Sequence, residues 1–135
     1  YSNFYHHSLE LLKNNEIRFL IASGRPFHLF HIGYNLKNHY NNIHWIPDYR
    51  DEWTSHDKYP KNNFLRKILY SLERRSEKKW TSNATKYISV SSYLCNNIKD
   101  LIKKPFIIIP NGFNAEEYIP SSVYPNLLDR RYLCF

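Results

Sequence analysis

Short apolar runs alternate along the chain with longer stretches in which apolar residues recur every three or four positions. Short apolar runs are typical of strands, and longer periodic stretches are typical of helices. The pattern predicts strands over residues 17–22, 43–46, 87–90 and 106–109. It predicts helices over residues 3–14, 26–39 and 63–80, and a fourth helix that is capped by Ser91 or Ser92 and carries Leu94, Ile98, Leu101 and Ile102.

The alternation of these elements predicts the fold class. Strands separated by helices pair in parallel through right-handed crossovers, and near-continuous apolar strands indicate a sheet that is covered on both faces. The predicted fold is therefore α/β, a doubly wound, mostly parallel Rossmann-like sheet with helices on both faces. Ligands of such sheets bind outside the carboxyl ends of the strands. The segments that follow the predicted strands are residues 23–26, 47–53, 91–92 and 110–113.

Three prolines carry local expectations. Pro26 is predicted at the first position of a helix, where its missing N–H costs nothing. Pro47 supplies no N–H to a ladder, so regular pairing of the second strand is predicted to end there. Residues 110–113 are predicted to form a turn, because an Asn-Gly pair, here Asn111 and Gly112, tolerates positive φ.

Length and composition indicate one packed domain. The chain has 135 residues, of which 42% are apolar and 17% aromatic, which is too much apolar surface for a disordered protein. The sequence has no Met and no signal peptide, and it ends in a strand-like run over residues 131–135, so residues 1–135 are expected to be one incomplete domain. Cys95 and Cys134 lack disulfide or zinc spacing, which favours a reducing, cytoplasmic setting.

The excess of positive charge is local. The net charge is +7, while residues 57–104 alone hold twelve bases and four acids. Such a face favours partners that carry negative charge, which include phosphorylated substrates, anionic lipid and nucleic acid. The bases of the third helix are expected to attract an anionic membrane surface, the alternative being a solvated helix face; they are Lys67, Arg74, Arg75, Lys78 and Lys79.

The residues after the second strand are the strongest candidates for chemistry. Residues 48–53 contain three carboxylates, one guanidinium and two aromatic rings. Arg50 can pair with phosphate oxygens, while a carboxylate of Asp48 or Asp51 can hydrogen-bond to sugar hydroxyls or to a leaving proton. The alternative is a structural ion-pair network of these three residues, with Trp53 packed over it as a lid.

Two further signals are weaker. Ser23, Gly24 and Arg25 lie at a predicted helix N-terminus, which favours an anion, but the pattern favours an ordinary turn between a strand and a helix. The chain contains neither the dinucleotide-binding glycine pattern nor a P-loop. His28 and His31 are three residues apart but lack acidic or Cys companions, so no metal site is predicted.

The order of these motifs resembles the N-terminal domain of family-4 glycosyltransferases of the GT-B fold. The resemblance covers about residues 15–118 and is carried by five segments in order. These are Ser23-Gly-Arg-Pro-Phe27, Asp48-Tyr-Arg-Asp-Glu-Trp53, a long helix with Glu73, Tyr87-Ile-Ser-Val-Ser-Ser-Tyr-Leu94, and Ile109-Pro-Asn-Gly-Phe-Asn114. The sequence departs from the family at Asn114, where Asp is common, and in lacking the Gly-rich loop that follows the family's first strand.

The resemblance implies a retaining transferase that needs no metal or other cofactor and takes its sugar from a nucleotide-sugar donor. The acceptor is expected to be a glycan or a lipid-linked glycan, in the cytoplasm or at the inner face of the membrane. This domain shapes the acceptor side of the cleft, and the first strand or strands and a C-terminal donor-binding domain are expected to lie outside the chain. The isolated chain is accordingly expected to be inactive.

The resemblance also suggests roles for individual residues. Arg50 stands where many members have a His, and its expected role is charge stabilisation near the leaving diphosphate. Asp48 or Asp51 is expected to orient the acceptor hydroxyl or Arg50 itself. The expected substrate-binding residues are Ser23, Gly24, Arg25, Trp53, Asn111 and Gly112.

Two other functions are compatible with the composition. A nucleic-acid-binding module is suggested by the pI of about 9.4 and by aromatic residues interleaved with bases. The chain lacks the signatures of common nucleic-acid-binding folds, and most of its aromatic residues fall on predicted core faces, so no nucleic-acid partner is expected. A non-catalytic α/β scaffolding domain is the third interpretation.

Overall fold

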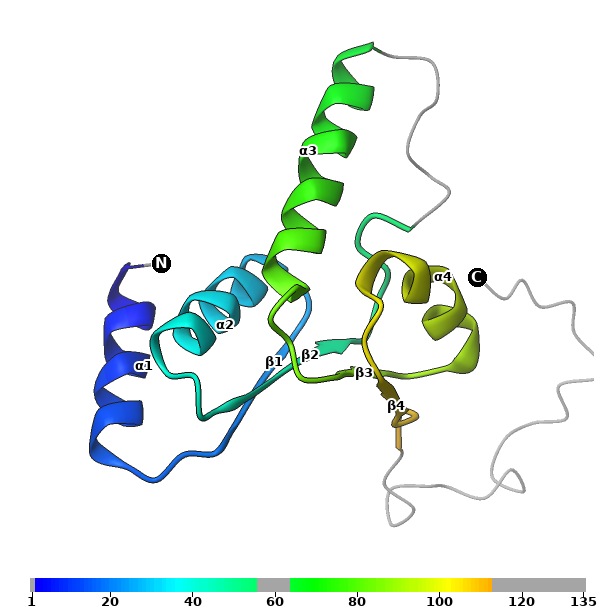
Figure 1. The fold of residues 1–135 in the computed structure, drawn as a ribbon. Coiled ribbons are helices and arrows are strands. Elements are labelled where there is room, and N and C mark those ends of the chain that lie inside the picture. The colour runs from blue at the N-terminus through cyan, green and yellow to red at the C-terminus, as the bar shows by residue number, and fades with distance from the viewer. Residues whose placement is uncertain (1, 56–63, 113–135) are drawn as a thin grey trace, which may run out of the picture.

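Four helices and four strands make up residues 2–55 and 64–112, the part of the chain that the computed structural model describes (Figure 1). The helices are α1 (Ser2–Asn14), α2 (His28–His39), α3 (Phe64–Thr81) and α4 (Ser92–Ile102). The strands are β1 (Phe19–Ser23), β2 (His44–Tyr49), β3 (Tyr87–Ser89) and β4 (Phe106–Ile108). All neighbouring strands are parallel, in the order β1-β2-β3-β4. The predicted α/β class, a Rossmann-like parallel sheet with helices, is confirmed.

The helices that connect the strands lie together above the sheet in Figure 1. The sheet face beneath them carries large aromatic residues of the core, and Phe30 of α2 packs against them; the fully buried rings are Phe30, Trp45, Tyr49 and Tyr87. α4 contributes the four apolar residues that its period predicts, and all four are buried: Leu94, Ile98, Leu101 and Ile102. On the opposite face, Phe19 and Ile21 are 63% and 55% exposed.

Local chemistry explains how α4 begins and ends. Ser91 is its N-cap, and the Ser91 hydroxyl accepts a hydrogen bond from the Leu94 backbone N–H at 3.2 Å. Of the two serines that the sequence offered as caps, Ser91 is therefore the one used. Lys103 ends the helix in the left-handed conformation with φ of 49°, and its N–H donates to the Lys99 carbonyl.

Two of the proline predictions are wrong. α2 begins at His28, because Pro26 and Phe27 form a tight turn before it, in which the Pro26 carbonyl accepts from Leu29; the Arg25–Pro26 peptide bond is cis. β2 continues through Pro47, which is the register partner of Ala22. Proline removes only a donor, and other carbonyls of β2 still accept hydrogen bonds: Trp45 accepts from Thr85, and Asp48 accepts from Gly24.

The predicted turn after the fourth strand does not form over the described residues 110–112. The Ile109 N–H still donates to the Ser89 carbonyl at 2.8 Å, so the chain continues alongside β3 beyond the end of β4. Gly112 has no positive φ. Phe113, Asn114 and the apolar run over residues 131–135 lie outside the described residues.

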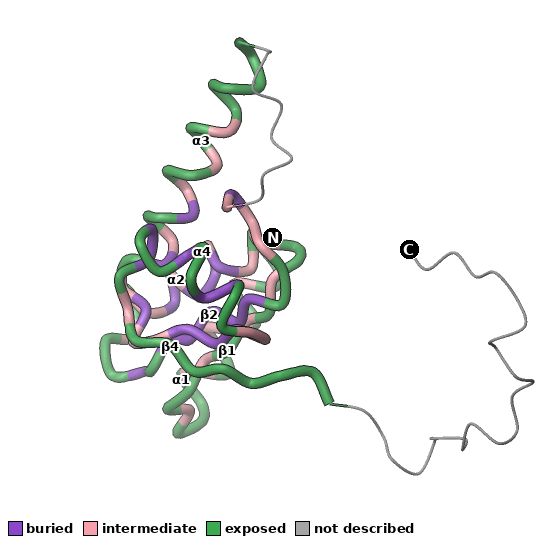
Figure 2. The backbone as a smooth tube through the Cα atoms, turned by 90° about the vertical axis from the view of Figure 1, so that its right-hand side faces the viewer, coloured by how far each residue is buried: buried purple, intermediate pink, exposed green. Residues whose placement is uncertain are grey.

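The first half of α3 extends away from the sheet, whereas its second half lies over α2 (Figures 1 and 2). Glu77 and Thr81 in the second half are buried, while the large apolar residues of the first half are exposed. The length and period of α3 were predicted from the sequence, but its projection into solvent was not.

Candidate functional site

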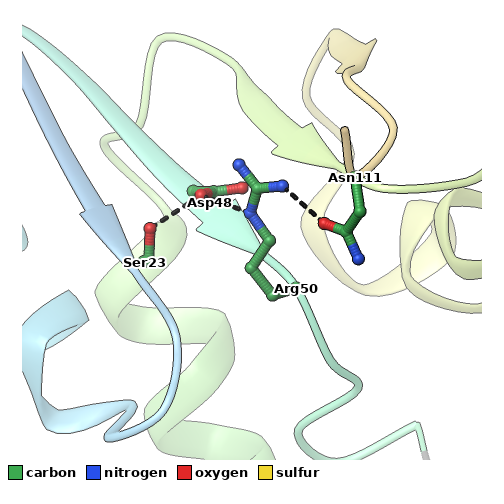
Figure 3. Close-up of polar contacts among 4 residues, drawn as sticks. All are labelled: Ser23, Asp48, Arg50 and Asn111. Atoms are coloured by element: carbon green, nitrogen blue, oxygen red, sulfur yellow. Dashed lines mark hydrogen bonds and ion pairs between the residues drawn. The ribbon is translucent and has the colours of Figure 1, made fainter. Parts of the chain in front are cut away.

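Four polar side chains meet at the carboxyl edge of the sheet (Figure 3). Asp48 Oδ2 accepts one hydrogen bond from Ser23 Oγ at 2.7 Å and another from Arg50 Nε at 2.9 Å. Arg50 Nη1 donates to Asn111 Oδ1, also at 2.9 Å. The structure thus brings together four of the predicted site residues from three separate segments of the chain.

Strand register places these groups. Ser23 and Asp48 are partners across β1 and β2, and the Gly24 N–H donates to the Asp48 carbonyl at 2.8 Å. Asp48 is 3% exposed, so its carboxylate depends on the Arg50 guanidinium and the Ser23 hydroxyl to offset the loss of water. Asp48 Oδ1 has no hydrogen-bond partner among the described residues. A buried oxygen of this kind can accept a donor from a ligand or a water molecule.

A shallow basin of about 400 Å³ lies beside this cluster. Its wall comes from the loops after β1 and β2 and from the start of α4, and its lining residues are Arg25, Arg50, Asp51, Glu52, Val90, Ser91, Tyr93 and Leu94. Arg25 Nε lies 3.8 Å from Asp51 Oδ2, and both side chains are more than half exposed. An exposed pair of this kind contributes little to stability and can exchange partners with a ligand.

The basin offers two kinds of contact to a ligand. Arg25 and Arg50 present guanidinium groups, which match the oxygens of phosphate or carboxylate. Asp51 and Glu52 present carboxylates, which can accept hydrogen bonds from hydroxyl groups. Asn97 of α4 donates to Glu52 Oε1 and so ties the loop after β2 to α4.

The remaining predicted site residues do not line the basin. Trp53 stacks on Phe27, with ring centroids 4.9 Å apart and planes 5° apart, and also packs on Trp80, so its partly buried ring packs against the core and does not line the basin. A Cβ on Gly24 would meet the Phe27 ring at 2.4 Å, so this turn needs glycine for packing. At Gly112, no atom of the described residues beyond its chain neighbours lies within 4 Å of the Cβ position.

A second polar cluster was not predicted from the sequence. Glu77 of α3 is 0% exposed, and its carboxylate accepts hydrogen bonds from the Tyr49 hydroxyl at 3.0 Å and from the Thr54 N–H at 3.2 Å. The Thr54 hydroxyl donates to it as well. Burial raises the pKa of Glu77, and the bonds from Thr54 and Tyr49 and the charge of Arg74 oppose that shift. Burial also raises the pKa of Tyr49, and Glu77 adds to that shift.

This cluster fixes the loop that carries Arg50. Tyr49 and Thr54 flank residues 50–53, and both are bound to the same carboxylate of α3. Glu77 was overlooked because the many bases of α3 suggested a solvated face. The sequence did contain one signal for this residue. Glu77 lies four residues from both Glu73 and Thr81, which places these polar residues on a side of the helix away from its apolar residues.

Among residues 2–55 and 64–112, no group of three or more His, Cys, Asp or Glu side chains is placed to hold a metal ion. His31 stacks on Trp80 with ring centroids 4.8 Å apart, and burial, followed by the charge of Lys79, lowers its pKa. None of the described helices combines the length and the apolar character that crossing a membrane requires.

No protein-family model, curated protein or solved structure matches the chain.

Proposed function

We propose that this domain forms the acceptor side of the active-site cleft of a retaining, nucleotide-sugar-dependent glycosyltransferase. The supporting observation is Arg50, which the Asp48 and Asn111 side chains fix in place beside an open basin at the carboxyl edge of a parallel sheet. The order of the sequence motifs suggested the glycosyltransferase family. The geometry adds that the Arg50 guanidinium is already oriented beside the basin.

The proposed reaction moves a sugar between two oxygens. The bond from the anomeric carbon to the diphosphate oxygen breaks, and a bond from that carbon to the acceptor oxygen forms. The acceptor proton is transferred to the departing nucleoside diphosphate. In this proposal the Arg50 guanidinium stabilises the negative charge that develops on the diphosphate, as a metal ion does in other enzymes.

The remaining groups have supporting roles. Asp48 is a positioning residue, because its buried Oδ2 holds Arg50 Nε at 2.9 Å. Asp51 lies in the basin lining with an exposed carboxylate, where it can accept a hydrogen bond from an acceptor hydroxyl. Arg25 balances Asp51 until an acceptor binds. The acceptor is then a glycan or lipid-linked glycan, and the reaction takes place in the cytoplasm.

Because the proposal assigns donor binding to a second domain, the test compares the 135-residue chain with a complete protein that carries both domains. The complete protein is expected to release nucleoside diphosphate from UDP- or GDP-sugars when a glycan acceptor is present. Calorimetry is expected to find only weak binding of these donors to the 135-residue chain, because the donor site is assigned to a second domain. Micromolar binding by the chain alone would place the donor site here and overturn this assignment of domains.

A further inference from the structure

One stripe of α3 changes from apolar to basic along the helix. Phe64, Ile68 and Leu72 follow each other at four-residue spacing, and Arg75 and Lys79 continue the same stripe. Phe64 is 75% exposed and Leu72 is 53% exposed, and Leu69 beside them is 58% exposed. Side chains of this size are seldom grouped on the free surface of a monomer unless the surface binds something.

The basic end of the stripe borders a second basin. This basin has a volume of about 330 Å³ and lies between α3 and α4. Three bases of α3 line it together with one acid of α4, and the full lining is Ser71, Arg74, Arg75, Lys78, Asp100 and Leu101. Three cationic side chains against one carboxylate leave the basin with a net positive charge, which favours an anionic group.

The position of the stripe matches its chemistry. The half of α3 that carries Phe64 and Leu69 extends away from the sheet, and the basic half lies nearer the body of the domain (Figures 1 and 2). A flat membrane can therefore reach the apolar half without meeting the rest of the described domain. A helix with apolar residues on one side and bases next to them is typical of proteins that bind at the surface of a bilayer.

We propose that α3 docks onto an anionic phospholipid membrane. Phe64, Ile68, Leu69 and Leu72 enter the boundary between headgroups and acyl chains, and Arg75 and Lys78 contact the phosphate headgroups, one of which occupies the basin. This proposal is independent of the transferase assignment, because it uses none of the residues at the carboxyl edge of the sheet.

Charge favours a membrane over a second copy of the chain. α3 contains six bases and two acids, and one of the acids, Glu77, is buried. A symmetric dimer through α3 would bring two such basic helices together, and the repulsion opposes it. An anionic bilayer accepts both the apolar and the basic residues at once. Nucleic acid would be attracted to the bases but offers no site for a row of aliphatic side chains.

Sedimentation with lipid vesicles tests the proposal on the 135-residue chain. The chain is expected to bind vesicles of phosphatidylserine and phosphatidylcholine and to bind pure phosphatidylcholine at least tenfold more weakly. L69S/L72S is expected to weaken binding more than tenfold. R75Q/K78Q is expected to weaken it about thirtyfold, since each base near an anionic membrane contributes about fivefold. Added salt should lower the binding of the parent more than that of R75Q/K78Q.

Two control variants distinguish binding through this surface of α3 from non-specific binding to vesicles. I21S removes an exposed apolar side chain from the open sheet face, and K13Q/R18Q removes two exposed bases near β1. Both are expected to bind vesicles as the parent does, and circular dichroism checks that every variant is folded. Equal binding to neutral vesicles, equal losses in the controls, or a dimer in sedimentation that L69S/L72S dissociates would each overturn the proposal.

Discussion

The Arg50 guanidinium of the β2 loop donates to the Asn111 side chain, 61 residues further along the chain, at 2.9 Å. Its Nε donates at the same time to the buried carboxylate of Asp48. One side chain therefore connects the end of β2 with the segment that follows β4, across the end of β3. Arg50 is held in one orientation at the edge of the basin before any ligand is bound.

Under the proposed function, Arg50→Ala is expected to lower turnover of a transferase that contains this domain by about 10²- to 10³-fold, because it removes a preorganised charge from the proposed site of the leaving diphosphate. It is also expected to lower the free energy of unfolding by about 1–3 kcal/mol, since Ser23 is then the one side-chain partner that the described residues leave to the buried Asp48 carboxylate. Steady-state kinetics and urea unfolding measure the two effects. Arg18→Ala, at an exposed arginine before β1, is the control and should leave turnover unchanged.

Asp51→Asn is expected to lower turnover without a matching loss of stability. Its carboxylate is 58% exposed and lies 3.8 Å from Arg25, so the ion pair contributes about 0–1 kcal/mol to folding. The substitution preserves shape and removes only the charge that would orient an acceptor hydroxyl. Kinetics at saturating substrates provide the measurement. Turnover within about threefold of the parent would make the pair structural and assign catalysis to residues outside this chain.

The fold was predictable because its signals are local. The apolar period of α4 and the cap at Ser91 or Ser92 are encoded within a few residues, and both carry over to the structure. The site was predictable in part, since parallel strands bring Ser23, Asp48 and Asn111 to one edge. Trp53 was predicted to bind the ligand, but an aromatic ring near charged residues can either bind a ligand or pack inward. The stacking on Phe27 shows that this ring packs inward.

Other features depend on contacts that no local pattern records. Glu77 sits among bases on an exposed helix, and its burial requires Tyr49 and Thr54 from a distant segment. The exposed apolar half of α3 has the same period as a buried helix, so periodicity alone cannot distinguish the two. Pro47 was expected to end a strand, but the neighbouring carbonyls keep the ladder intact.

Glu77 is expected to give the protein a pH-dependent stability that Glu77→Gln removes. Burial raises the pKa of Glu77 in the folded state above its ordinary value of 4.5. The folded state then binds the Glu77 proton more tightly than the unfolded state does. The stability that this adds is fully present below the ordinary pKa and is lost as pH rises through the folded-state pKa.

Urea unfolding of the parent and of Glu77→Gln across this pH range provides the measurement. The parent is expected to lose stability relative to the variant as pH rises, by about 1.4 kcal/mol for each unit by which the pKa is raised. Glu10→Gln controls for the loss of an exposed carboxylate. A parent that gains stability relative to Glu77→Gln with rising pH would mean that the hydrogen bonds from Thr54 and Tyr49 outweigh burial.

Gly33→Ala is expected to destabilise the domain although alanine favours helices. A Cβ on Gly33 would lie 2.5 Å from two carbon atoms of the Trp45 ring, which is 0% exposed. The ring cannot easily move, because Trp45 Nε1 donates to the Trp80 carbonyl at 3.4 Å and the Phe30 ring makes a T-shaped contact with it, with ring centroids 5.9 Å apart. Overpacking of this kind costs about 1–3 kcal/mol or more, and the gain in helix propensity returns at most about 1 kcal/mol.

The matched control for this substitution is Gly112→Ala, where φ is not positive and no atom of the described residues beyond the chain neighbours lies within 4 Å of the new Cβ. That variant should unfold within about 0.5 kcal/mol of the parent, as is usual for exposed positions. Thermal and urea unfolding of both variants measure the difference. If Gly33→Ala were as stable as Gly112→Ala, α2 would not approach β2 as closely as the Trp45 contact requires, and the packing of this helix on the sheet would need revision.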